Sequence, residues 1–295
     1  MFPDWLTDLQ IESAPVPPAL NDATARGVLW QAAPASRRFL LDAPDVARYL
    51  AEDGHRLTIE RAHHANEADV MRLARTTPLA ALLYQRGMFA FHAAAVTSRP
   101  RGFLKPARST TTDGAILLAG DSGAGKSTLL AALLQHGWQM FADELAIVGL
   151  DKASKPVVFP THPEILLWQS AVEKLNLHGK TSRVLETREV YPAPNQFIAS
   201  PLPLCAIYWL SVHNGEKIEE EQIRGSKFFQ AINTLLYNSH IADALLDRAA
   251  HFRLASALTQ TISLHRLKRP QGQWSVEEMI RAVGENIRFT DGEKI

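Results

Sequence analysis

The stretch GDSGAGKST, residues 120–128, decides which fold the rest of the chain can adopt. It follows the apolar run AILLA at residues 115–119 and precedes the apolar run LLAALL at residues 129–134. This pattern predicts a β-strand, a tight loop and an α-helix in succession. The stretch fits G-x-x-x-x-G-K-[ST], in which backbone N–H groups and the positive end of the new helix converge on phosphate oxygens. The sequence therefore predicts a phosphate-binding loop.

Each part of this loop has an expected role. Lys126 supplies a positive charge for the β- and γ-phosphates of ATP, and Ser127 offers a hydroxyl to Mg²⁺. The alternative is a glycine-rich turn that binds nothing. The residues expected to contact the nucleotide are Gly120, Asp121, Ser122, Gly123, Ala124, Gly125, Lys126, Ser127 and Thr128.

The composition limits the class of protein. The chain has 295 residues, of which 46% are hydrophobic and 21% are charged, as in a globular protein of one large or two modest domains. Lys+Arg and Asp+Glu both total 31, so no excess charge favours nucleic acid or an anionic membrane. The single cysteine, Cys205, cannot form an internal disulfide, and the N-terminus has no signal-peptide pattern. We therefore expect a cytoplasmic protein with neither nucleic acid nor membrane as a partner.

The first part of the chain predicts a small α+β region, residues 1–85. The proline-rich residues 1–22 are expected to be extended and weakly ordered. Short strands are expected at residues 28–31, 38–41 and 56–60, with a short helix at residues 44–52. Helical spacing follows at residues 67–87. A second domain, residues 86–295, then contains the phosphate-binding loop.

An acidic pair follows the loop. Residues 138–142 predict a strand that runs into Asp143 and Glu144 and continues at residues 145–148. One of these two carboxylates can hold Mg²⁺, directly or through water, and the other can take a proton from a nucleophile. The alternative is an ordinary surface turn. Upstream, the apolar residues 88–96 predict a buried strand that contains one histidine, His92, which is either a core residue or part of the site.

Other segments carry weaker signals. Gly137 is expected to end the helix after the loop. Residues 97–113 form a basic segment, which is either a solvated connector or a guide for an acidic partner; its cations are Arg99, Arg101, Lys105 and Arg108. Helices are expected at residues 166–175, 226–250 and 275–287, and strands at residues 204–212 and 262–267. His162 and Glu164, ahead of the first of these helices, could face the site or serve only in a turn.

Three of these stretches together resemble the bacterial HPr kinase/phosphorylase family. They are HAAAV at residues 92–96, LLAGDSGAGKS at residues 117–127 and ADE at residues 142–144. The resemblance is stronger to the shorter HPr-kinase-related peptide and protein serine kinases, some of which accompany lasso-peptide precursors. It covers about residues 80–150 and continues loosely downstream. It implies an α/β fold, with a P-loop kinase domain of the HPr kinase/phosphoenolpyruvate carboxykinase-like type behind an α+β N-terminal cap.

The resemblance also implies roles for single residues. Residues 120–128 bind the ATP phosphates with Ser127 as a Mg²⁺ ligand, and His92 is an active-site histidine. Asp143 and Glu144 match an Asp-Asp pair whose second member deprotonates the acceptor serine. This chain has Glu in the second position and lacks a clear Glu-Ile-Arg-Gly-Leu-Gly segment downstream. A reverse phosphorylase activity and a third metal-binding carboxylate, for which Glu164 is a candidate, therefore stay open.

The expected function is that of an ATP/Mg²⁺-dependent kinase that transfers the γ-phosphate to a serine hydroxyl of a peptide or small protein. A lasso-peptide precursor or a carrier-type protein is the kind of partner that the resemblance implies. Two alternatives stay open: a kinase of a small metabolite or free amino acid, and a nucleotide-gated interaction protein with slow ATP hydrolysis. Assembly into a homo-oligomer also stays open.

Overall fold

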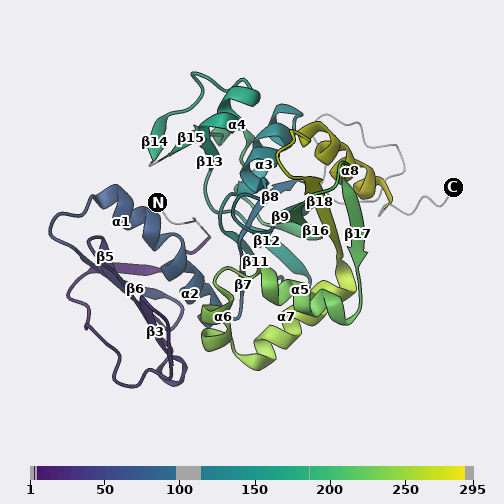
Figure 1. Ribbon diagram of the computed structural model, residues 1–295. Helices are drawn as coiled ribbons and strands as arrows, with labels where there is room; N and C mark the ends of the chain where they lie inside the picture. The colour runs from purple at the N-terminus through teal and green to yellow at the C-terminus, as the bar shows by residue number, and fades with distance from the viewer. Residues whose placement is uncertain (1–2, 4, 98–113, 186, 290–295) are drawn as a thin grey trace. The chain divides into compact units, whose positions relative to one another are not determined.

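The protein has an α/β fold, seen in a computed structural model that describes residues 3, 5–97, 114–185 and 187–289 (Figure 1). The chain divides into two compact units. The first contains Met1–Ala90 and Leu236–Ser256, and the second contains Phe91–Leu235 and Ala257–Ile295. The chain thus returns to the first unit late in the sequence, which the sequence did not indicate. The division into domains at residue 85 stays a prediction.

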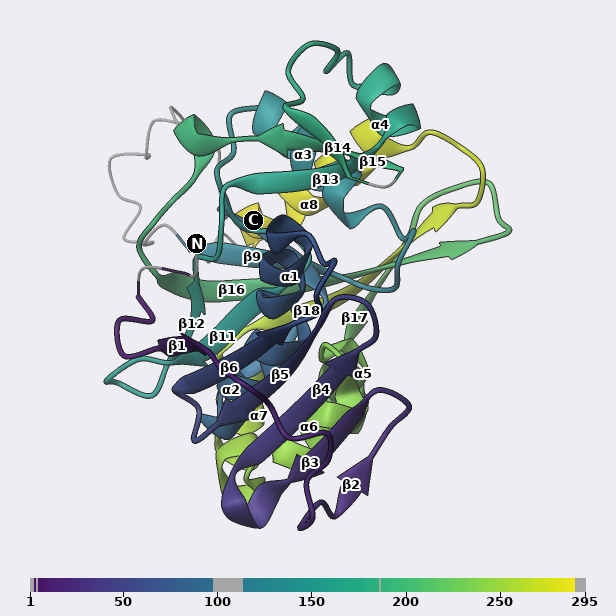
Figure 2. The same cartoon turned by 90° about the vertical axis from the view of Figure 1, so that its left-hand side faces the viewer.

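The first unit is built on a six-stranded sheet with the order β1-β6-β5-β4-β3-β2 (Figure 2). The strands from β2 to β6 are antiparallel to their neighbours, and β1 joins β6 in parallel. Helix α2 packs on β4 and β5, and α6 packs on α2 and β3. The elements are β1 (Gln10–Ser13), β2 (Ala25–Arg26), β3 (Trp30–Ala33), η1 (Pro34–Ser36), β4 (Arg38–Ala43), β5 (Ala47–Glu52), β6 (Arg56–Arg61), α1 (Glu67–Ala74), α2 (Thr77–Gln85) and α6 (Ser239–Leu245).

Two expectations for this unit were wrong. Of the lead-in expected at residues 1–22, the described part from residue 5 onward is not weakly ordered, because β1 pairs with β6 and the side chains of Val16 and Leu20 are buried. Residues 44–52 do not form a helix, because β5 pairs with β4 and buries Tyr49 and Ala51 at alternate positions. The expected strands at 38–41 and 56–60 and the helical region at 67–87 are confirmed, whereas the strand expected at 28–31 begins only at Trp30.

The second unit contains residues 120–128, which the sequence predicts to be a phosphate-binding loop, and a larger sheet with the order β10-β8-β9-β16-β12-β11. Strand β18 pairs with β16, and β17 pairs with β18. A separate three-stranded sheet has the order β13-β15-β14. The strands are β8 (Ala93–Thr97), β9 (Ala115–Ala119), β10 (Met140–Ala142), β11 (Ala146–Leu150), β12 (Pro156–Phe159), β13 (Glu164–Trp168), β14 (Arg183–Leu185), β15 (Arg188–Pro192), β16 (Leu202–His213), β17 (Glu219–Ile223) and β18 (Ser263–Pro270).

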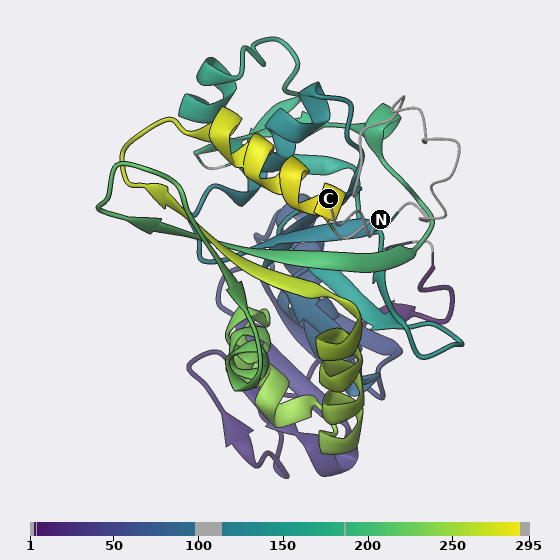
Figure 3. The same ribbon diagram turned by 90° about the vertical axis from the view of Figure 1, so that its right-hand side faces the viewer.

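The helices of the second unit are α3 (Lys126–Gln135), α4 (Gln169–Lys174), η2 (Pro194–Gln196), α5 (Ser226–Leu235) and α8 (Val276–Phe289). Strand β7 (Phe89–Phe91) and helix α7 (Arg248–Thr261) carry the chain between the units. Alternate residues of the sheet form one apolar core with α3 and α8. Tyr208 Oη on β16 donates to the Val283 carbonyl on α8. Figure 3 shows α8, in yellow, lying across one face of the sheet. This period-2 pattern fixes which face of the sheet the two helices cover.

The directions of the strands place His92, the loop after β9 and Asp143 at the same edge of this sheet. Strands β9, β16 and β18 are parallel, so their carboxyl ends lie at the same edge. Strand β8 is antiparallel to β9 and pairs Ala93 with Ala119, so His92 lies beside the start of the loop. Strand β10 is antiparallel to β8, and Ala142 therefore leads Asp143 toward the same edge. In α/β sheets, ligands bind outside the carboxyl ends of the parallel strands.

Several element boundaries in this unit differ from the expected ones. The buried strand expected at 88–96 is two strands that separate at His92. The strand expected to continue through 138–148 turns at Glu144, so β10 and β11 lie at different places in the sheet. The helix expected at 166–175 begins only at Gln169, because Ile165 and Leu167 are buried alternately in β13. The helix expected at 226–250 is interrupted and forms α5, α6 and the start of α7.

Other expectations for this unit are confirmed. The strand and helix around the loop are β9 and α3, and the later strands and helix correspond to β16, β18 and α8. Gly137 has a φ of 84°, and the N–H groups of Gly137 and Trp138 donate to the Leu134 and Leu133 carbonyls at the end of α3. These are the two hydrogen bonds of a Schellman cap. The basic segment predicted at 97–113 lies almost entirely outside the described residues. Within the described ranges, no helix has the length and apolar character needed to cross a membrane.

Candidate active site

Three glycines give the phosphate-binding loop its shape. Gly120, Gly123 and Gly125 have φ angles of 139°, 82° and 102°, a region that residues with side chains rarely adopt. A Cβ atom at Gly120 would lie 2.3 Å from the carbonyl oxygen of Leu210 on β16, so the position has no room for a side chain. The glycines therefore permit the turn that connects β9 to α3.

The first turn of α3 provides backbone donors. The N–H of Leu129 donates to the Gly125 carbonyl at 2.9 Å, and this is the first hydrogen bond within the helix. The N–H groups of Lys126, Ser127 and Thr128 therefore have no acceptor within the helix. Together with the positive end of the helix dipole, such groups form an anion-binding site.

Arg269, near the carboxyl end of β18, orients the loop peptides. Its Nε donates to the Ala124 carbonyl and its Nη2 to the Gly123 carbonyl, both at 3.1 Å. Because the C=O and N–H of a trans peptide point in opposite directions, the N–H of Gly125 points away from the guanidinium. Arg269 therefore fixes the orientation of the two loop peptides whose carbonyls it binds.

Lys126 is buried and hydrogen-bonded within the loop. Its Nζ donates to the carbonyls of Gly120 at 2.8 Å and Asp121 at 3.0 Å. Burial lowers the pKa of Lys126, although the negative charge of Asp143 opposes this shift. A buried ammonium that has only neutral acceptors is poised to exchange them for phosphate oxygens.

Asp143 lies directly beside the start of α3. Its Oδ1 accepts a hydrogen bond from Ser127 Oγ at 3.0 Å, and its Oδ2 accepts one from the Leu166 N–H at 3.2 Å. The residue is 1% exposed, and burial, followed by the neighbouring charge of Glu144, raises the pKa of Asp143 to about 6. No described Lys or Arg forms a salt bridge with this carboxylate. A cation placed here would offset the burial of its charge.

Glu144 occupies a strained turn next to Asp143. Its φ is 66°, and the N–H of Leu145 donates to the Asp143 carbonyl at 2.8 Å across it, as in a γ-turn with positive φ. Such turns are rare for residues with a side chain and occur mostly where a site requires them. The turn separates the two carboxylates, so that Asp143 is buried while Glu144 is half-buried and lines the cavity described below.

Arg188 holds Glu144 in place from the three-stranded sheet. Its Nη1 lies 3.1 Å from Glu144 Oε1. Residues 168 and 188 are cross-strand partners in β13 and β15, and the Arg188 guanidinium lies over the Trp168 ring, 5.6 Å from its centroid. The ion pair and the cation–π contact together position the Glu144 carboxylate.

His92 lines the same region from between β7 and β8. It is half-buried, and its backbone N–H donates to the Leu235 carbonyl. Burial, with a further contribution from the charge of Lys126, lowers the pKa of His92 to about 4. The imidazole is therefore neutral at physiological pH, and it can exchange hydrogen bonds with a bound group without adding charge.

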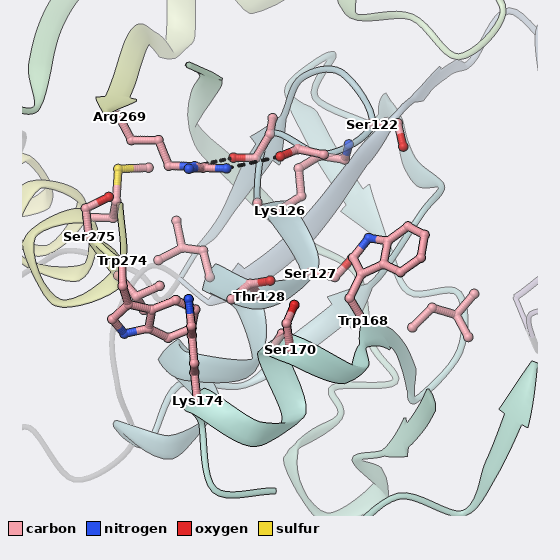
Figure 4. Close-up of a pocket in the computed structure, with 18 of the residues that line it drawn as sticks. Ser122, Lys126, Ser127, Thr128, Trp168, Ser170, Lys174, Arg269, Trp274 and Ser275 are labelled. Carbon is pink, nitrogen blue, oxygen red and sulfur yellow. Dashed lines mark hydrogen bonds between the residues drawn. The ribbon is translucent and has the colours of Figure 1, made fainter. Parts of the chain in front are cut away.

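These residues surround a cavity of about 340 Å³, a size that suits a small ligand. Figure 4 shows the labelled residues of its walls. Lys174 and Trp274 lie on one side of Ser127 and Thr128, and Trp168 lies on the other side. The lining residues include His92, Ser122, Gly123, Ala124, Gly125, Lys126, Ser127, Thr128, Asp143, Glu144, Trp168, Ser170, Lys174, Arg188, Arg269, Trp274 and Ser275. A single cavity thus combines the phosphate loop with the acidic pair.

The donors at the loop fit a magnesium ion that arrives with a nucleotide. Among the described residues, no group of three or more His, Cys, Asp or Glu side chains could hold a metal by itself. Mg²⁺ in phosphate sites commonly uses one or two protein oxygens, and phosphate and water oxygens complete its octahedron. The Ser127 hydroxyl and the buried Asp143 carboxylate are such a pair.

Most of the site residues expected from the sequence meet at this cavity, but two groups do not line it. Gly120 and Asp121 are not among its described lining residues, and their carbonyls accept hydrogen bonds from Lys126 Nζ. His162 and Glu164 are not among its described lining residues. No sequence pattern indicates that the Gly120 and Asp121 carbonyls accept hydrogen bonds from Lys126; the structure alone shows this.

Sequence reasoning missed Arg188, Arg269 and the two tryptophans of the cavity. Arg269 is 145 residues from Ala124, and Arg188 is 44 residues from Glu144. No motif spacing connects such distant positions. The sequence marks neither arginine nor tryptophan: Trp168 falls within the helix expected at residues 166–175, no strand was expected near Arg188, and single Arg and Trp residues are too common to identify a site.

The comparisons with known proteins identify no family. No family model matches the chain, and no curated protein matches it. Among solved structures, the chain is similar to the HPr(Ser) kinase/phosphatase from Coxiella burnetii, with 10% identity and a TM-score of 0.32. That similarity covers 68% of this chain and 97% of the other. With this identity and TM-score, the similarity gives no residue correspondence.

Proposed function

We propose that this protein is an ATP- and Mg²⁺-dependent phosphotransferase that transfers the γ-phosphate to a serine hydroxyl of a peptide or small protein. The observation that carries the proposal is the hydrogen bond from Ser127 to the buried Asp143, with Glu144 next in the chain and directed to the cavity. It combines a metal-binding pair and a separate carboxylate at one phosphate loop. Phosphoryl transfer requires mainly positioning and neutralisation of charge, which these groups supply.

The residues divide the work as follows. Lys126 and the N–H groups of the loop bind the phosphates, and Arg269 keeps the loop in the binding conformation. Mg²⁺ held by Ser127 and Asp143 would neutralise charge on the phosphates. Glu144 accepts the proton of the attacking hydroxyl while the bond between the γ-phosphorus and the leaving oxygen breaks and ADP departs. His92 hydrogen-bonds to the γ-phosphate or to the nucleophile.

The proposal names a serine hydroxyl as the group that accepts the phosphate. It rests on the family resemblance of the sequence and on the half-buried position of Glu144 at the cavity, where a hydroxyl can reach it. The basic segment at residues 97–113 supports a peptide or protein partner through its charge. A small metabolite or free amino acid as the acceptor, or slow hydrolysis by a nucleotide-gated interaction protein, are the alternatives that the experiment must separate.

Product analysis separates these possibilities. The full chain is incubated with Mg²⁺, ATP labelled in its γ-phosphate and a library of serine-containing peptides, and the label is followed into peptide or inorganic phosphate. We expect labelled phosphoserine peptides, whose formation is lost in Lys126→Ala. A parallel reaction with free amino acids tests the small-acceptor alternative. Release of inorganic phosphate alone, at the same rate with and without peptides, would contradict the proposal.

A further inference from the structure

We propose that the wall of the cavity formed by Trp274, Lys174 and Ser275 is a nucleobase site, at which the base of the bound nucleoside triphosphate stacks on the Trp274 indole. This inference rests on the proposed function and adds to it the place and the chemistry of nucleoside recognition. The loop and the acidic pair account for phosphates, but neither of them can bind an aromatic base.

The first observation is the position and exposure of Trp274. The side chain lines the cavity on the turn between β18 and α8, yet it is 42% exposed, which is unusual for so large an apolar residue. Lys174 Nζ lies 5.0 Å from the centroid of its ring and fixes the indole through a cation–π contact. A fixed and partly open indole in a cavity is a stacking surface for an aromatic ligand.

The second observation is a polar atom without a partner. Ser275 is 8% exposed and lines the cavity next to Trp274, and its Oγ has no hydrogen-bond partner among the described residues. A buried hydroxyl without a partner is unfavourable, so its presence in a cavity wall indicates a group that arrives with a ligand. The base edge and the ribose hydroxyls of a nucleoside both offer such a group.

The orientation of the nucleotide in the cavity follows from the position of Glu144, at the end opposite Trp274. The γ-phosphate must face Glu144, which Arg188 connects to Trp168. Figure 4 shows Trp168 on the opposite side of Ser127 and Thr128 from Trp274 and Lys174. A triphosphate whose last phosphate faces Glu144 therefore extends its nucleoside toward Trp274. Apolar neighbours continue this wall, namely Val276 and Met279 at the start of α8.

Calorimetric titration of the full chain with Mg²⁺·ATP and, separately, with Mg²⁺·triphosphate tests this inference. Trp274→Ala is expected to weaken ATP binding about 5- to 150-fold, the range found when a stacking aromatic residue is removed. Triphosphate affinity should stay the same, because the phosphate loop is intact. Trp274→Phe, which keeps an aromatic face, should retain most of the ATP affinity. Because every base has an aromatic face, GTP and CTP should be affected in the same direction as ATP.

Ser275→Ala gives an independent readout. It removes no hydrogen bond from the ligand-free protein, so its thermal midpoint should equal or exceed that of the wild type. Its ATP affinity should nevertheless fall while its triphosphate affinity does not. A purely structural role of Ser275 would instead lower the midpoint.

The outcomes separate this inference from the proposed function. Unchanged ATP affinity in Trp274→Ala, with triphosphate binding intact, would overturn the base site and leave the phosphate site standing. Equal losses of ATP and triphosphate affinity would also overturn it, since Trp274 would then support the phosphate site. A loss of ATP affinity in Trp168→Ala but not in Trp274→Ala would overturn it as well, because the base would then bind at the opposite end of the cavity. Failure of the wild type to bind either ligand would overturn the proposed function and this inference with it.

Discussion

Asp143 carries a buried carboxylate whose negative charge lowers the stability of the protein. Its carboxylate is 1% exposed, and it accepts hydrogen bonds from the neutral Ser127 hydroxyl and the neutral Leu166 N–H. Burial raises its pKa to about 6, so the ligand-free protein holds an unfavourable negative charge at neutral pH. A bound cation would remove this penalty, which is consistent with our proposal that Asp143 is a Mg²⁺ ligand.

This residue makes stability depend on pH in a predictable direction. Because the pKa of Asp143 is raised on folding from 3.8 to about 6, the native state binds more protons between these values, and stability falls as pH rises through them. Asp143→Asn has no carboxylate at this position, so its stability does not fall with rising pH for this reason. Its free energy of unfolding relative to wild type should therefore increase between pH 4 and pH 7.5, by up to about 3 kcal/mol.

Urea unfolding without Mg²⁺ at the two pH values measures this difference. The lowered pKa of His92 acts in the opposite direction, because the buried imidazole must become charged in acid, but it acts in both proteins and cancels in the comparison. A difference in stability between the two proteins that is the same at both pH values would show that the Asp143 carboxylate is not disfavoured by burial.

Glu144 and Asp143 should be separable by function. Glu144→Gln keeps the phosphate loop and the Ser127–Asp143 pair but loses the proton acceptor, so it should bind nucleotide normally and transfer the phosphoryl group about 10²–10⁴-fold more slowly. Asp143→Asn should instead raise the Mg²⁺ concentration needed for half-maximal activity. Steady-state rates measured as a function of ATP and Mg²⁺ distinguish the two, and interchangeable behaviour would contradict the assigned roles.

At the scale of elements, the turn from β9 into α3 depends on backbone that only glycine can supply. Gly120 has both a positive φ and a close approach to the Leu210 carbonyl, whereas Gly123 has a positive φ with no described atom within 4 Å of the place that a Cβ would occupy. The two positions therefore separate the effect of backbone conformation from that of steric contact.

Alanine substitutions at the two glycines should differ in cost. Gly123→Ala is expected to destabilise the protein by about 1–2 kcal/mol, the cost of a positive φ alone. Gly120→Ala should cost clearly more, because its Cβ would also lie 2.3 Å from a backbone oxygen of β16 that cannot move without disturbing the sheet. Urea unfolding of both variants provides the test, and equal costs would show that the contact with Leu210 relaxes easily.

The elements also show how far sequence could predict this structure. The β9–loop–α3 unit was predictable because apolar runs, glycines and the GKS ending all agree on one local structure. The strand β5 was mistaken for a helix because its pairing with β4 is a tertiary contact that the local sequence does not indicate. The turn at Glu144 was missed for the same reason, since a positive φ at a glutamate has no local sequence signal. Arg269 and Arg188 join the site only through strand ends that meet at one edge.

At the scale of the whole molecule, the second unit contains every residue that lines the cavity, and residues 236–256 leave it to join the first unit. The sequence offers one further feature at this scale, the cations of residues 97–113, in a chain whose total charge is zero. Because long-range attraction cannot come from net charge, a local basic segment is where an acidic or phosphate-bearing partner would be drawn.

Neutralising this segment should affect the peptide acceptor and not ATP. The combined replacement of Arg99, Arg101, Lys105 and Arg108 by serine should raise KM for a peptide acceptor and leave KM for ATP nearly unchanged. Added salt should weaken peptide affinity in the wild type more than in the variant, because exposed charges are screened. An unaltered peptide KM at low salt would show that the segment is a connector, and would favour a small-molecule acceptor.

The central claim is that the phosphate loop and the buried Asp143 form one magnesium–nucleotide site. Calorimetric titration of a non-hydrolysable ATP analogue, with Mg²⁺ and with EDTA, into the wild type and Asp143→Asn tests it most directly. We predict that Mg²⁺ strengthens binding to the wild type and has a much smaller effect on Asp143→Asn. Equal binding to the wild type with Mg²⁺ and with EDTA, or an undiminished Mg²⁺ effect in the variant, would contradict the claim.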